Sequence, residues 1–411
     1  MRLLVILRSN FPYPLTTGGQ QAVFHMIDYL RDKVDISILY IKNKHISKNH
    51  ESELKNKWSN VKFYCYKEPF YEKFGCNYAS LARISNKILS KIFRKDPIYT
   101  KQKIYSGFDN YSSSFLDYIL TIIEKDRIEI VQVEFFDLMN LVYILPPDIK
   151  KVFIQHEIRY IKNKRIFDKR NDCTLLDKLM LNKQKSEEIA AMNHYDSVVT
   201  LTNIDKQILL EDGVTSEVIS SPACIASIRE KNVSVSYNRI SFLGGFNHTP
   251  NAEGVLWFLE KVWPLVLAQN KTLMFDIIGL WPKKTKRSLE KEYPQIKFHG
   301  IVEDLSTILP NSVMIIPILT GSGMRMKILD AINYGCAMIS TSIGCEGLDL
   351  IDGKDCYIAD EPEVFANKLL TLINNKSLQE SFYKNAINWY NKNYTIDILG
   401  KKRLEVYDSL M

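Results

Sequence analysis

The fold class is inferred first from VMIIPILTGSGMRMKILDAINYG, residues 313–335. Its first seven residues are apolar and predict a buried strand, and the residues after Gly323 have helical spacing up to Gly335. Between them, Gly321 and Gly323 allow backbone N–H groups to approach an anion closely, and a helix N-terminus adds unpaired donors and a positive dipole. A strand, a glycine loop and a helix in this order predict a phosphate-binding turn of a parallel α/β sheet.

Two cations follow the glycine loop. Arg325 and Lys327 are the only basic residues between positions 301 and 350. In the first turn of a helix they oppose the helix dipole, which is unfavourable unless an anion is bound. A diphosphate would use the loop, the helix N-terminus and both cations. The alternative is a tight turn followed by two solvated side chains. Asp330, further along the helix, is either an acceptor for ribose hydroxyls or a structural carboxylate.

The same alternation of short apolar strands and amphipathic helices extends in both directions from this stretch. RLLVILRSN (2–10) and DISILYI (35–41) are predicted strands of the first half, and RISFLGG (239–245) and TLMFDIIG (272–279) of the second. Such βαβ series predict α/β domains with parallel sheets covered on both faces. Residues 220–238 lack clear periodicity and indicate a boundary between two domains. Ligands of such sheets bind outside the carboxyl ends of the strands, so we expect the site between the two domains.

We expect three parts of the chain. Residues 1–222 form an N-terminal acceptor-binding domain, residues 223–393 form a C-terminal donor-binding domain, and residues 394–411 form a helix that returns to the N-terminal domain.

The 411-residue chain has a net charge of +7, and the surplus is confined to its first half. Residues 1–200 hold 32 basic and 23 acidic side chains, whereas residues 201–411 hold 22 and 24. This asymmetry points to an anionic partner: nucleic acid, phospholipid or a phosphorylated substrate. We do not expect nucleic acid, since no recognition motif accompanies the charge. The basic amphipathic stretch 81–95 is either a solvated helix face or a contact with an anionic membrane surface.

The cysteines and carboxylates indicate no metal and no disulfide framework. Seven cysteines are scattered without Cys-x-x-Cys spacing, which favours a reducing compartment. The chain contains no Asp-x-Asp and no His/Cys cluster with zinc spacing, so a metal or other cofactor is not expected to be required. No apolar segment approaches the roughly 18 residues of a membrane span. We therefore expect a cytoplasmic protein, either free or peripheral on the inner face of the cytoplasmic membrane.

Four segments of the chain together resemble the retaining family 4 glycosyltransferases. They are FPYPLTTGGQQ (11–21), VQVEFFDLMNLVYILP with KVFIQHEIRY (131–160), SFLGGFNHTPNAEGVLWFLEKVWPLV (241–266) and residues 299–348 around the glycine loop. The resemblance covers most of the chain. It implies the GT-B fold, in which two Rossmann-like domains face each other across a cleft. It also implies transfer of a sugar, with retention, from a UDP- or GDP-sugar to an acceptor hydroxyl on a glycan or a lipid-linked molecule.

The resemblance assigns roles to individual residues. The expected catalytic residues are His156, Arg325 and Lys327, with His156 near the outer hydroxyls of the sugar and the two cations on the departing diphosphate. The expected donor-binding residues are Gly18, Gly19, Gly321, Ser322, Gly323, Asp330 and Glu346. From position alone, a histidine at the end of a strand such as His156 is more often simply hydrogen-bonded in place. Glu134 and Glu157, at strand ends, are acceptor-side candidates or merely solvated carboxylates.

In one respect the chain departs from this family. Many members carry two glutamates separated by seven residues, whereas Ser322 and Asp330 occupy these positions here. The branch of the family with a GSG loop in place of the first acidic residue has the same loss, so the resemblance does not exclude activity. The loss makes plausible a catalytically silent subunit that binds sugar nucleotides. A nucleotide-sugar epimerase, an enzyme class that shares the fold, is a further alternative. The family implies bacterial surface-polysaccharide or lipid-linked oligosaccharide assembly. The donor base, the sugar, the acceptor and the linkage are not given by these motifs.

Overall fold

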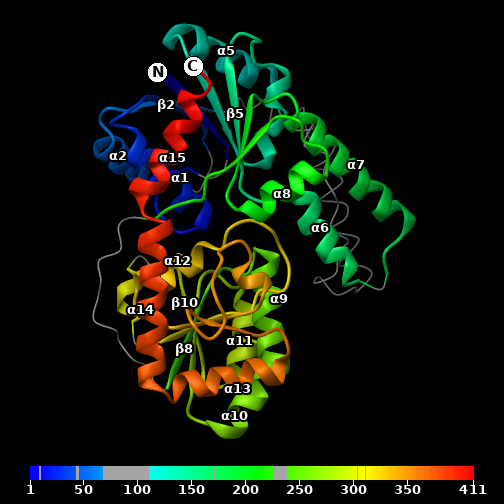
Figure 1. Cartoon of the computed structure of the whole chain (residues 1–411), viewed down its shortest axis with the longest axis vertical. Coiled ribbons are helices and arrows are strands. Elements are labelled where there is room, and N and C mark those ends of the chain that lie inside the picture. Colours follow the sequence, from blue (N-terminus) through cyan, green and yellow to red (C-terminus); the bar gives the residue numbers. More distant parts are fainter. Residues whose placement is uncertain are drawn as a thin grey trace.

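A computed structural model describes residues 1–8, 11–42, 46–67, 111–170, 172–225, 238–302, 304–310 and 312–411. Within them the chain forms two α/β domains, stacked along the long axis of the molecule (Figure 1). The predicted fold class is confirmed. The basic stretch 81–95 lies outside the described residues.

The N-terminal domain is built on a parallel seven-stranded sheet of order β3-β2-β1-β4-β5-β6-β7. Its strands are β1 (Arg2–Leu7), β2 (Asp35–Ile41), β3 (Lys62–Tyr66), β4 (Ile130–Glu134), β5 (Lys150–Gln155), β6 (Ser197–Thr200) and β7 (Glu217–Ser220). Its helices are α1 (Gly18–Leu30), α2 (Lys48–Lys57), α5 (Ser113–Asp126), α6 (Arg159–Asp168), α7 (Leu175–Met192) and α8 (Asn203–Glu211), with a 3-10 segment at Phe136–Tyr143. The central strand β1 is completely buried from Leu3 to Leu7, because helices cover both faces of the sheet.

The C-terminal domain contains a parallel six-stranded sheet of order β10-β9-β8-β11-β12-β13. Its strands are β8 (Arg239–Leu243), β9 (Met274–Ile278), β10 (Ile296–Gly300), β11 (Val313–Ile316), β12 (Met338–Ser340) and β13 (Tyr357–Ile358). Its helices are α9 (Thr249–Trp257), α10 (Trp263–Gln269), α11 (Lys283–Glu292), α12 (Met326–Asn333), α13 (Pro362–Ile373) and α14 (Lys376–Asn393), with 3-10 turns at Leu305–Thr307 and Ile343–Cys345.

Residues 251–269 have helical spacing in the sequence, but they do not form one regular α-helix. A π turn at Phe258–Val262 separates α9 from α10. Pro264 follows directly, and proline has no N–H to donate and its ring crowds the carbonyl four residues earlier. Widening the preceding turn accommodates the ring without ending the helix.

The last helix, α15 (Ile396–Asp408), leaves the C-terminal domain and packs on the N-terminal one, so the two chain termini lie close together (Figure 1). Gly400 allows the close approach, since a Cβ there would lie 2.2 Å from Cδ1 of Tyr29 on α1. Arg403, buried on the same helix, donates from Nη2 to the carbonyl of Ser221 at 3.2 Å. The helix therefore fastens the two domains together on the side where the termini lie.

Candidate functional site

A cavity of about 600 Å³ lies between the two domains. On the N-terminal side it is lined by residues that follow β1, β4, β5 and β6, and on the C-terminal side by residues that follow β8, β9, β10 and β11. These are the carboxyl ends of the strands in both sheets, where open α/β sheets bind ligands. Of the expected site residues, the lining includes Gly18, Gly19, His156, Ser322, Arg325, Lys327 and Asp330.

Two helix N-termini face the cavity from opposite domains. On the N-terminal side, Thr17 caps α1 by accepting from the backbone N–H of Gln20, and Gly18 and Gly19 form the first turn. Gly18 packs against α12, because a Cβ at this position would lie 3.0 Å from Cγ of Met326. On the C-terminal side, α12 begins without a side-chain cap. Both ends offer unpaired backbone N–H groups to a negatively charged ligand.

Lys327 is a cation in the lining of this cavity. Its Nζ donates to Oδ1 of Asn251 at 2.7 Å and lies 4.6 Å from the ring centroid of Phe242. Burial, with a contribution from the charge of Arg325, lowers the pKa of Lys327 to about 7. A lysine that is difficult to charge in the empty cavity becomes easier to charge when an anion binds beside it.

Asp330 lies one turn further along α12 and is also buried. Its Oδ1 accepts a long hydrogen bond, 3.5 Å, from Nε2 of Gln21 on α1. Burial raises the pKa of Asp330 to about 7. The carboxyl therefore retains capacity for a further polar partner, as expected of a residue that would bind hydroxyl groups.

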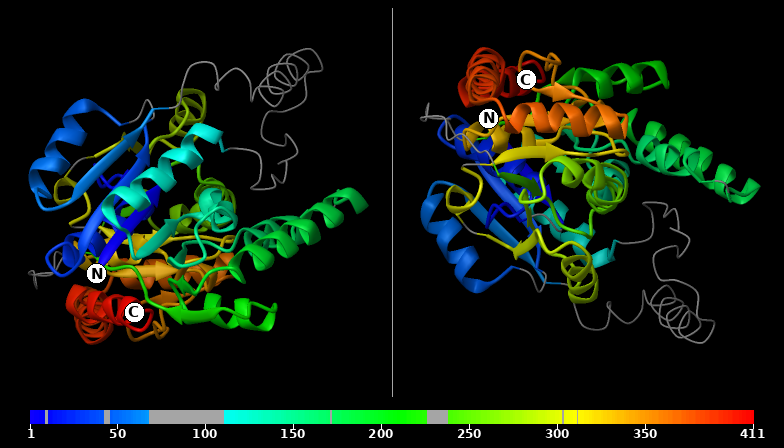
Figure 2. Two further views of the ribbon diagram at one scale, coloured as in Figure 1. Left: turned by 90° about the horizontal axis from the view of Figure 1, so that it is seen from above. Right: turned by 90° about the horizontal axis from the view of Figure 1, so that it is seen from below.

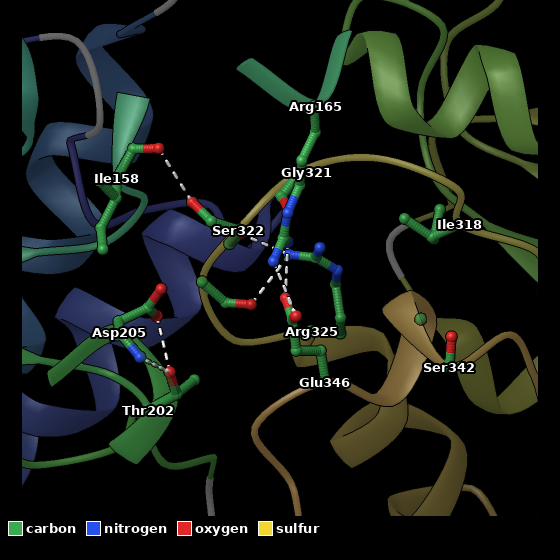
Figure 3. Close-up of polar contacts among 12 residues, drawn as sticks. Ile158, Arg165, Thr202, Asp205, Ile318, Gly321, Ser322, Arg325, Ser342 and Glu346 are labelled. Atoms are coloured by element: carbon green, nitrogen blue, oxygen red, sulfur yellow. Dashed lines mark hydrogen bonds and ion pairs between the residues drawn. The ribbon is translucent and has the colours of Figure 1, made fainter. Parts of the chain in front are cut away.

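Arg325 is buried at the start of α12, and its guanidinium folds back on the glycine loop (Figure 3). Nη1 donates to the carbonyls of Ser322 and Gly323, the latter at 2.8 Å. Within the part of the chain that the structure describes, Nε and Nη2 have no hydrogen-bond partner. Burial lowers the pKa of this guanidinium. Arg325 therefore orders the loop with one nitrogen and leaves two buried donors unsatisfied, an arrangement that costs free energy unless a ligand pairs with them.

The glycine loop is docked on the N-terminal domain. Ser322 donates its hydroxyl to the carbonyl of Ile158 at 3.1 Å. Gly323 has φ = +77°, and a Cβ there would lie 2.1 Å from the carbonyl oxygen of His156. Glycine is required at this position both by conformation and by the close approach of the two domains.

His156 is held between an aromatic ring and a carboxylate. Its ring stacks on Phe135, with centroids 3.9 Å apart and planes at 15°, and Phe135 has a positive φ of 69°. Its Nε2 lies 2.5 Å from Oε2 of Glu134, and Oε1 of Glu134 accepts from Nε2 of Gln132 at 2.6 Å. Glu134 is only 3% exposed and lies behind His156, outside the lining of the cavity. The arrangement suits Glu134 to orienting the imidazole.

This hydrogen-bonded chain continues to the C-terminal helix. The hydroxyl of Tyr407, on α15, donates to Oε1 of Gln132, and both side chains are buried. The returning helix thus contributes to the support of His156. No motif in the sequence indicated Gln132 or Tyr407, because their partners are distant along the chain.

Glu157 lines the cavity next to His156. Although burial raises its pKa, a hydrogen bond with His248 and the charges of Lys162 and Arg159 lower the pKa of Glu157 to about 2. Nζ of Lys162 lies 2.9 Å from Oε2 of Glu157. The carboxylate is therefore ionised and already paired.

Glu346, expected at the donor, pairs instead with Arg165 of α6 in the opposite domain (Figure 3). The interaction is bidentate, with Nη1 to Oε2 at 2.7 Å and Nη2 to Oε1 at 2.8 Å. Arg165 Nη1 also donates to the carbonyl of Gly321. Gly321, Gly323 and Glu346 lie outside the cavity lining, next to it in the interdomain joint. Sequence reasoning missed Arg165, since a basic residue on an amphipathic helix carries no signal of its partner.

Among the residues that the structure describes, no group of three or more His, Cys, Asp and Glu side chains could hold a metal ion. In the same residues no helix has the length and apolar character required to cross a bilayer.

The family match lies in the C-terminal half: residues 237–375 match the model of the family described as glycosyl transferases group 1. A curated Klebsiella pneumoniae protein, described as an uncharacterized 44.6 kDa protein in the cps region, is 29% identical over 163 residues. The aligned part is 38% of this chain and 42% of that relative. The chain thus spans less than half of the relative's length.

Solved structures match over nearly the whole chain. Sucrose-phosphate synthase from Thermosynechococcus elongatus has a TM-score of 0.71 at 11% identity, covering 100% of this chain and 99% of the other. A mutant of S. aureus TarM, in complex with fondaparinux, alpha-GlcNAc-glycerol and UDP, has a TM-score of 0.68 at 12% identity, covering 98% and 99%. Anabaena HepE in complex with UDP-glucose has a TM-score of 0.64 at 9% identity, covering both chains completely. The group 1 match over residues 237–375 and these structural neighbours together support a glycosyltransferase with the GT-B fold.

Proposed function

We propose that the protein is a retaining glycosyltransferase that transfers a sugar from a UDP- or GDP-sugar to an acceptor hydroxyl. One observation carries the proposal: the cavity between the two sheets contains Lys327, whose pKa is depressed, beside Arg325, which has two buried donors without partners. A diphosphate beside Lys327 would stabilise the charged form of this lysine, and the guanidinium of Arg325 adds a second positive charge to the same site.

In the proposed reaction the bond between the anomeric carbon and the diphosphate oxygen breaks, and the oxygen takes the electron pair. Lys327, Arg325 and the N-termini of α1 and α12 stabilise the charge that develops on this oxygen. The acceptor oxygen forms the new bond from the same face, and its proton passes to the departing diphosphate. His156, held by Glu134, positions the outer hydroxyls of the sugar. The diphosphate charge is met by side chains and backbone, so we propose that no metal is required.

Uridine is the base to test first. The complexes of TarM and HepE contain UDP or UDP-glucose, and these two chains share the fold of this one. We propose an acceptor hydroxyl on a glycan or a lipid-linked molecule, in bacterial surface-polysaccharide or lipid-linked oligosaccharide assembly. The match to a Klebsiella protein in a cps region supports this setting. In this proposal the enzyme works in the cytoplasm, at or near the inner face of the membrane.

The test begins with calorimetric titration of UDP and GDP in the presence of EDTA. We expect saturable binding of one nucleotide. Arg325→Ala is expected to lower turnover by at least about a hundredfold, as for loss of one transition-state donor. Lys284→Ala, which changes an exposed lysine on α11 outside the cavity lining, is the matched control and should behave as wild type. Near-normal turnover of Arg325→Ala would contradict the proposed mechanism.

Product analysis separates this enzyme from the two alternatives. With the UDP- or GDP-sugar that binds, NMR of the glycosylated acceptor should show the anomeric configuration of the donor. Slow hydrolysis of the donor without an acceptor would exclude a silent binding subunit. Rapid release of free or epimerised sugar with no requirement for an acceptor would instead indicate an epimerase.

A further inference from the structure

The polar side chains behind His156 form a continuous hydrogen-bonded series that begins on the C-terminal helix. The hydroxyl of Tyr407, on α15, bonds to Oε1 of Gln132, and Nε2 of Gln132 bonds to Oε1 of Glu134 at 2.6 Å. Oε2 of Glu134 lies 2.5 Å from Nε2 of His156. We call Tyr407, Gln132 and Glu134 the support series of His156.

The support series is buried along its whole length. Glu134, Gln132 and Tyr407 are 3%, 2% and 0% exposed. Burying polar groups costs desolvation free energy, and replacing both partners of a buried hydrogen bond by apolar groups of the same shape is often nearly neutral. Stability alone therefore gives little reason for three polar side chains in succession at this place. Their position, between the last helix and a residue of the cavity, points to a role at His156.

The hydrogen bonds of the support series all run toward Glu134. A carboxylate only accepts, so Nε2 of Gln132 and Nε2 of His156 both donate to it. With its amide hydrogens turned to Glu134, Gln132 presents its carbonyl oxygen to Tyr407, whose hydroxyl therefore donates. Burial raises the pKa of Tyr407 to about 12, so the hydroxyl keeps its proton at physiological pH. The donating hydroxyl in turn keeps the Gln132 amide from turning over.

This direction decides which nitrogen of His156 is an acceptor. Because Nε2 carries the hydrogen that Glu134 accepts, Nδ1 of the neutral ring has a free lone pair. Stacking on Phe135, with ring centroids 3.9 Å apart, fixes the plane of the ring, but it does not select the tautomer. His156 lines the cavity, so an Nδ1 acceptor is suited to a hydroxyl of the sugar.

The far end of the support series is anchored where the chain leaves the N-terminal domain. The helix α15 packs on α1, and the two chain termini lie close together in every view (Figures 1 and 2). Arg403, one turn before Tyr407, donates from Nε to Oγ of Ser221 at 3.3 Å and from Nη2 to its carbonyl at 3.2 Å. Ser221 directly follows β7, the last strand of this domain. The place of the Tyr407 hydroxyl therefore depends on how α15 docks.

We propose that Tyr407 and Gln132 are positioning residues of the glycosyltransferase, which act through Glu134 on the orientation and the tautomer of His156. This role rests on the proposed function. The alternative is that Tyr407 only stabilises the docking of α15. The two roles differ in what they predict for sugar transfer and for double variants.

The test is sugar transfer by the full chain, with the UDP- or GDP-sugar that wild type uses, and calorimetric binding of the matching nucleotide, UDP or GDP. Tyr407→Phe removes one hydroxyl and keeps the ring. We expect kcat/KM to fall about fivefold, as for the loss of one hydrogen bond, with the Kd of the nucleotide within about twofold of wild type. The reason for this difference is that His156 faces the sugar, which UDP and GDP lack.

Two further variants control for stability. Tyr407→Phe combined with Gln132→Met removes both partners of one buried bond, so its melting temperature should stay close to that of wild type while kcat/KM falls about tenfold. Tyr390→Phe on α14 is the matched control. Tyr390 is 1% exposed, its hydroxyl bonds to the carbonyl of Ile225 at 3.5 Å, and it lies outside the cavity lining. Its kcat/KM should equal that of wild type.

A cycle of double variants separates positioning from stabilisation. In Glu134→Ala the link to His156 is already broken, so adding Tyr407→Phe should lower kcat/KM by less than about twofold more. If Tyr407 only stabilised α15, the full fivefold loss would persist in the Glu134→Ala background.

Two results would overturn the positioning role: wild-type kcat/KM in Tyr407→Phe and in its combination with Gln132→Met, or the same loss from Tyr407→Phe with and without Glu134. If Tyr407→Phe alone does not fold, the combination with Gln132→Met takes its place in the cycle. A wild-type protein that neither binds UDP or GDP nor transfers a sugar would refute the proposed function and the positioning role together. An active wild type with unchanged variants would refute the positioning role alone.

Discussion

The depressed pKa of Lys327 makes the affinity for UDP depend on pH. Burial holds this pKa at about 7 in the empty cavity, compared with about 10.4 for an exposed lysine. A bound diphosphate favours the charged form and raises the pKa again. Binding UDP above pH 7 should therefore take up a proton, and the dissociation constant should increase as the pH rises.

The size of the effect follows from the protonated fraction of the empty protein. With a pKa of about 7, about half of the Lys327 side chains are charged at pH 7 and about one in a hundred at pH 9. If the bound form stays charged, Kd for UDP increases about fiftyfold over this range. The terminal phosphate of UDP, with a pKa near 6, is already mostly ionised at pH 7 and adds little.

Calorimetry in two buffers with different ionisation enthalpies measures this directly. We expect uptake of about 0.5 proton at pH 7 and about 0.9 at pH 8. In Lys327→Met the proton uptake and the pH dependence should both decrease, and the part that remains would come from Asp330. Asp330→Asn is the second control, because Asp330 titrates in the same range. Since the Asp330 carboxylate raises the pKa of Lys327, its loss should move the pH at which UDP affinity begins to fall to a lower value. An affinity independent of pH in wild type, or an unchanged slope in Lys327→Met, would refute the reasoning.

The same lysine should reduce the stability of the unliganded protein. Its folded-state pKa lies below its unfolded one, so the folded state binds fewer protons and stability increases with pH between about 7 and 10.4. Lys327→Met should therefore raise the free energy of unfolding at pH 7 by about 1–3 kcal/mol, after the lost hydrogen bond to Asn251 is discounted. Urea unfolding should show the gain decreasing toward pH 10. If Lys327→Met raised the free energy of unfolding by the same amount at pH 7 and pH 10, the increase would come from packing of the methionine and not from loss of the lysine charge.

Three further substitutions test the supports of the cavity. Glu134→Ala leaves the imidazole of His156 without its carboxylate, and kcat/KM should fall about tenfold or more, whereas unchanged kinetics would remove the orienting role. In Gly323→Ala the new Cβ would have a positive φ and a carbonyl oxygen at 2.1 Å, so this variant should lower the free energy of unfolding by more than about 2 kcal/mol. The control is Gly213→Ala, where φ is +99° and no atom lies within 4 Å of the Cβ position. In the same thermal unfolding assay it should lose only the cost of the backbone conformation, about 1 kcal/mol. Arg165→Ala should lower the free energy of unfolding by about 1–3 kcal/mol, and the loss in the double variant with Glu346→Ala should be much smaller than the sum of the two single losses. A double variant whose loss equals that sum would show that this ion pair does not couple the domains.

Much of the fold was predictable because its signals are local. Apolar strands such as residues 2–7 and 313–316 are buried on both faces and therefore appear as continuous hydrophobic runs. The glycine loop before α12 was predictable for the same reason, since positive φ at Gly321 and Gly323 is needed by the turn itself. The interruption of the helix at Phe258–Val262 was missed, although Pro264 is visible in the sequence, because helical periodicity continues through it.

The two parallel sheets, the glycine loop and the residue types that line the cavity can be predicted from the amino-acid sequence, since each depends on spacing within one strand–loop–helix unit. Which of these residues contact each other depends on the tertiary structure. Gln21 and Asp330, Arg165 and Glu346, and Tyr407 and Gln132 are pairs separated by 309, 181 and 275 residues. A side chain's local pattern indicates whether it is buried or exposed but not its partner across a domain boundary. The pKa of Lys327, the docking of Gly323 on His156 and the support of His156 by α15 all depend on how the two domains close on each other, and that is fixed by packing over the whole chain.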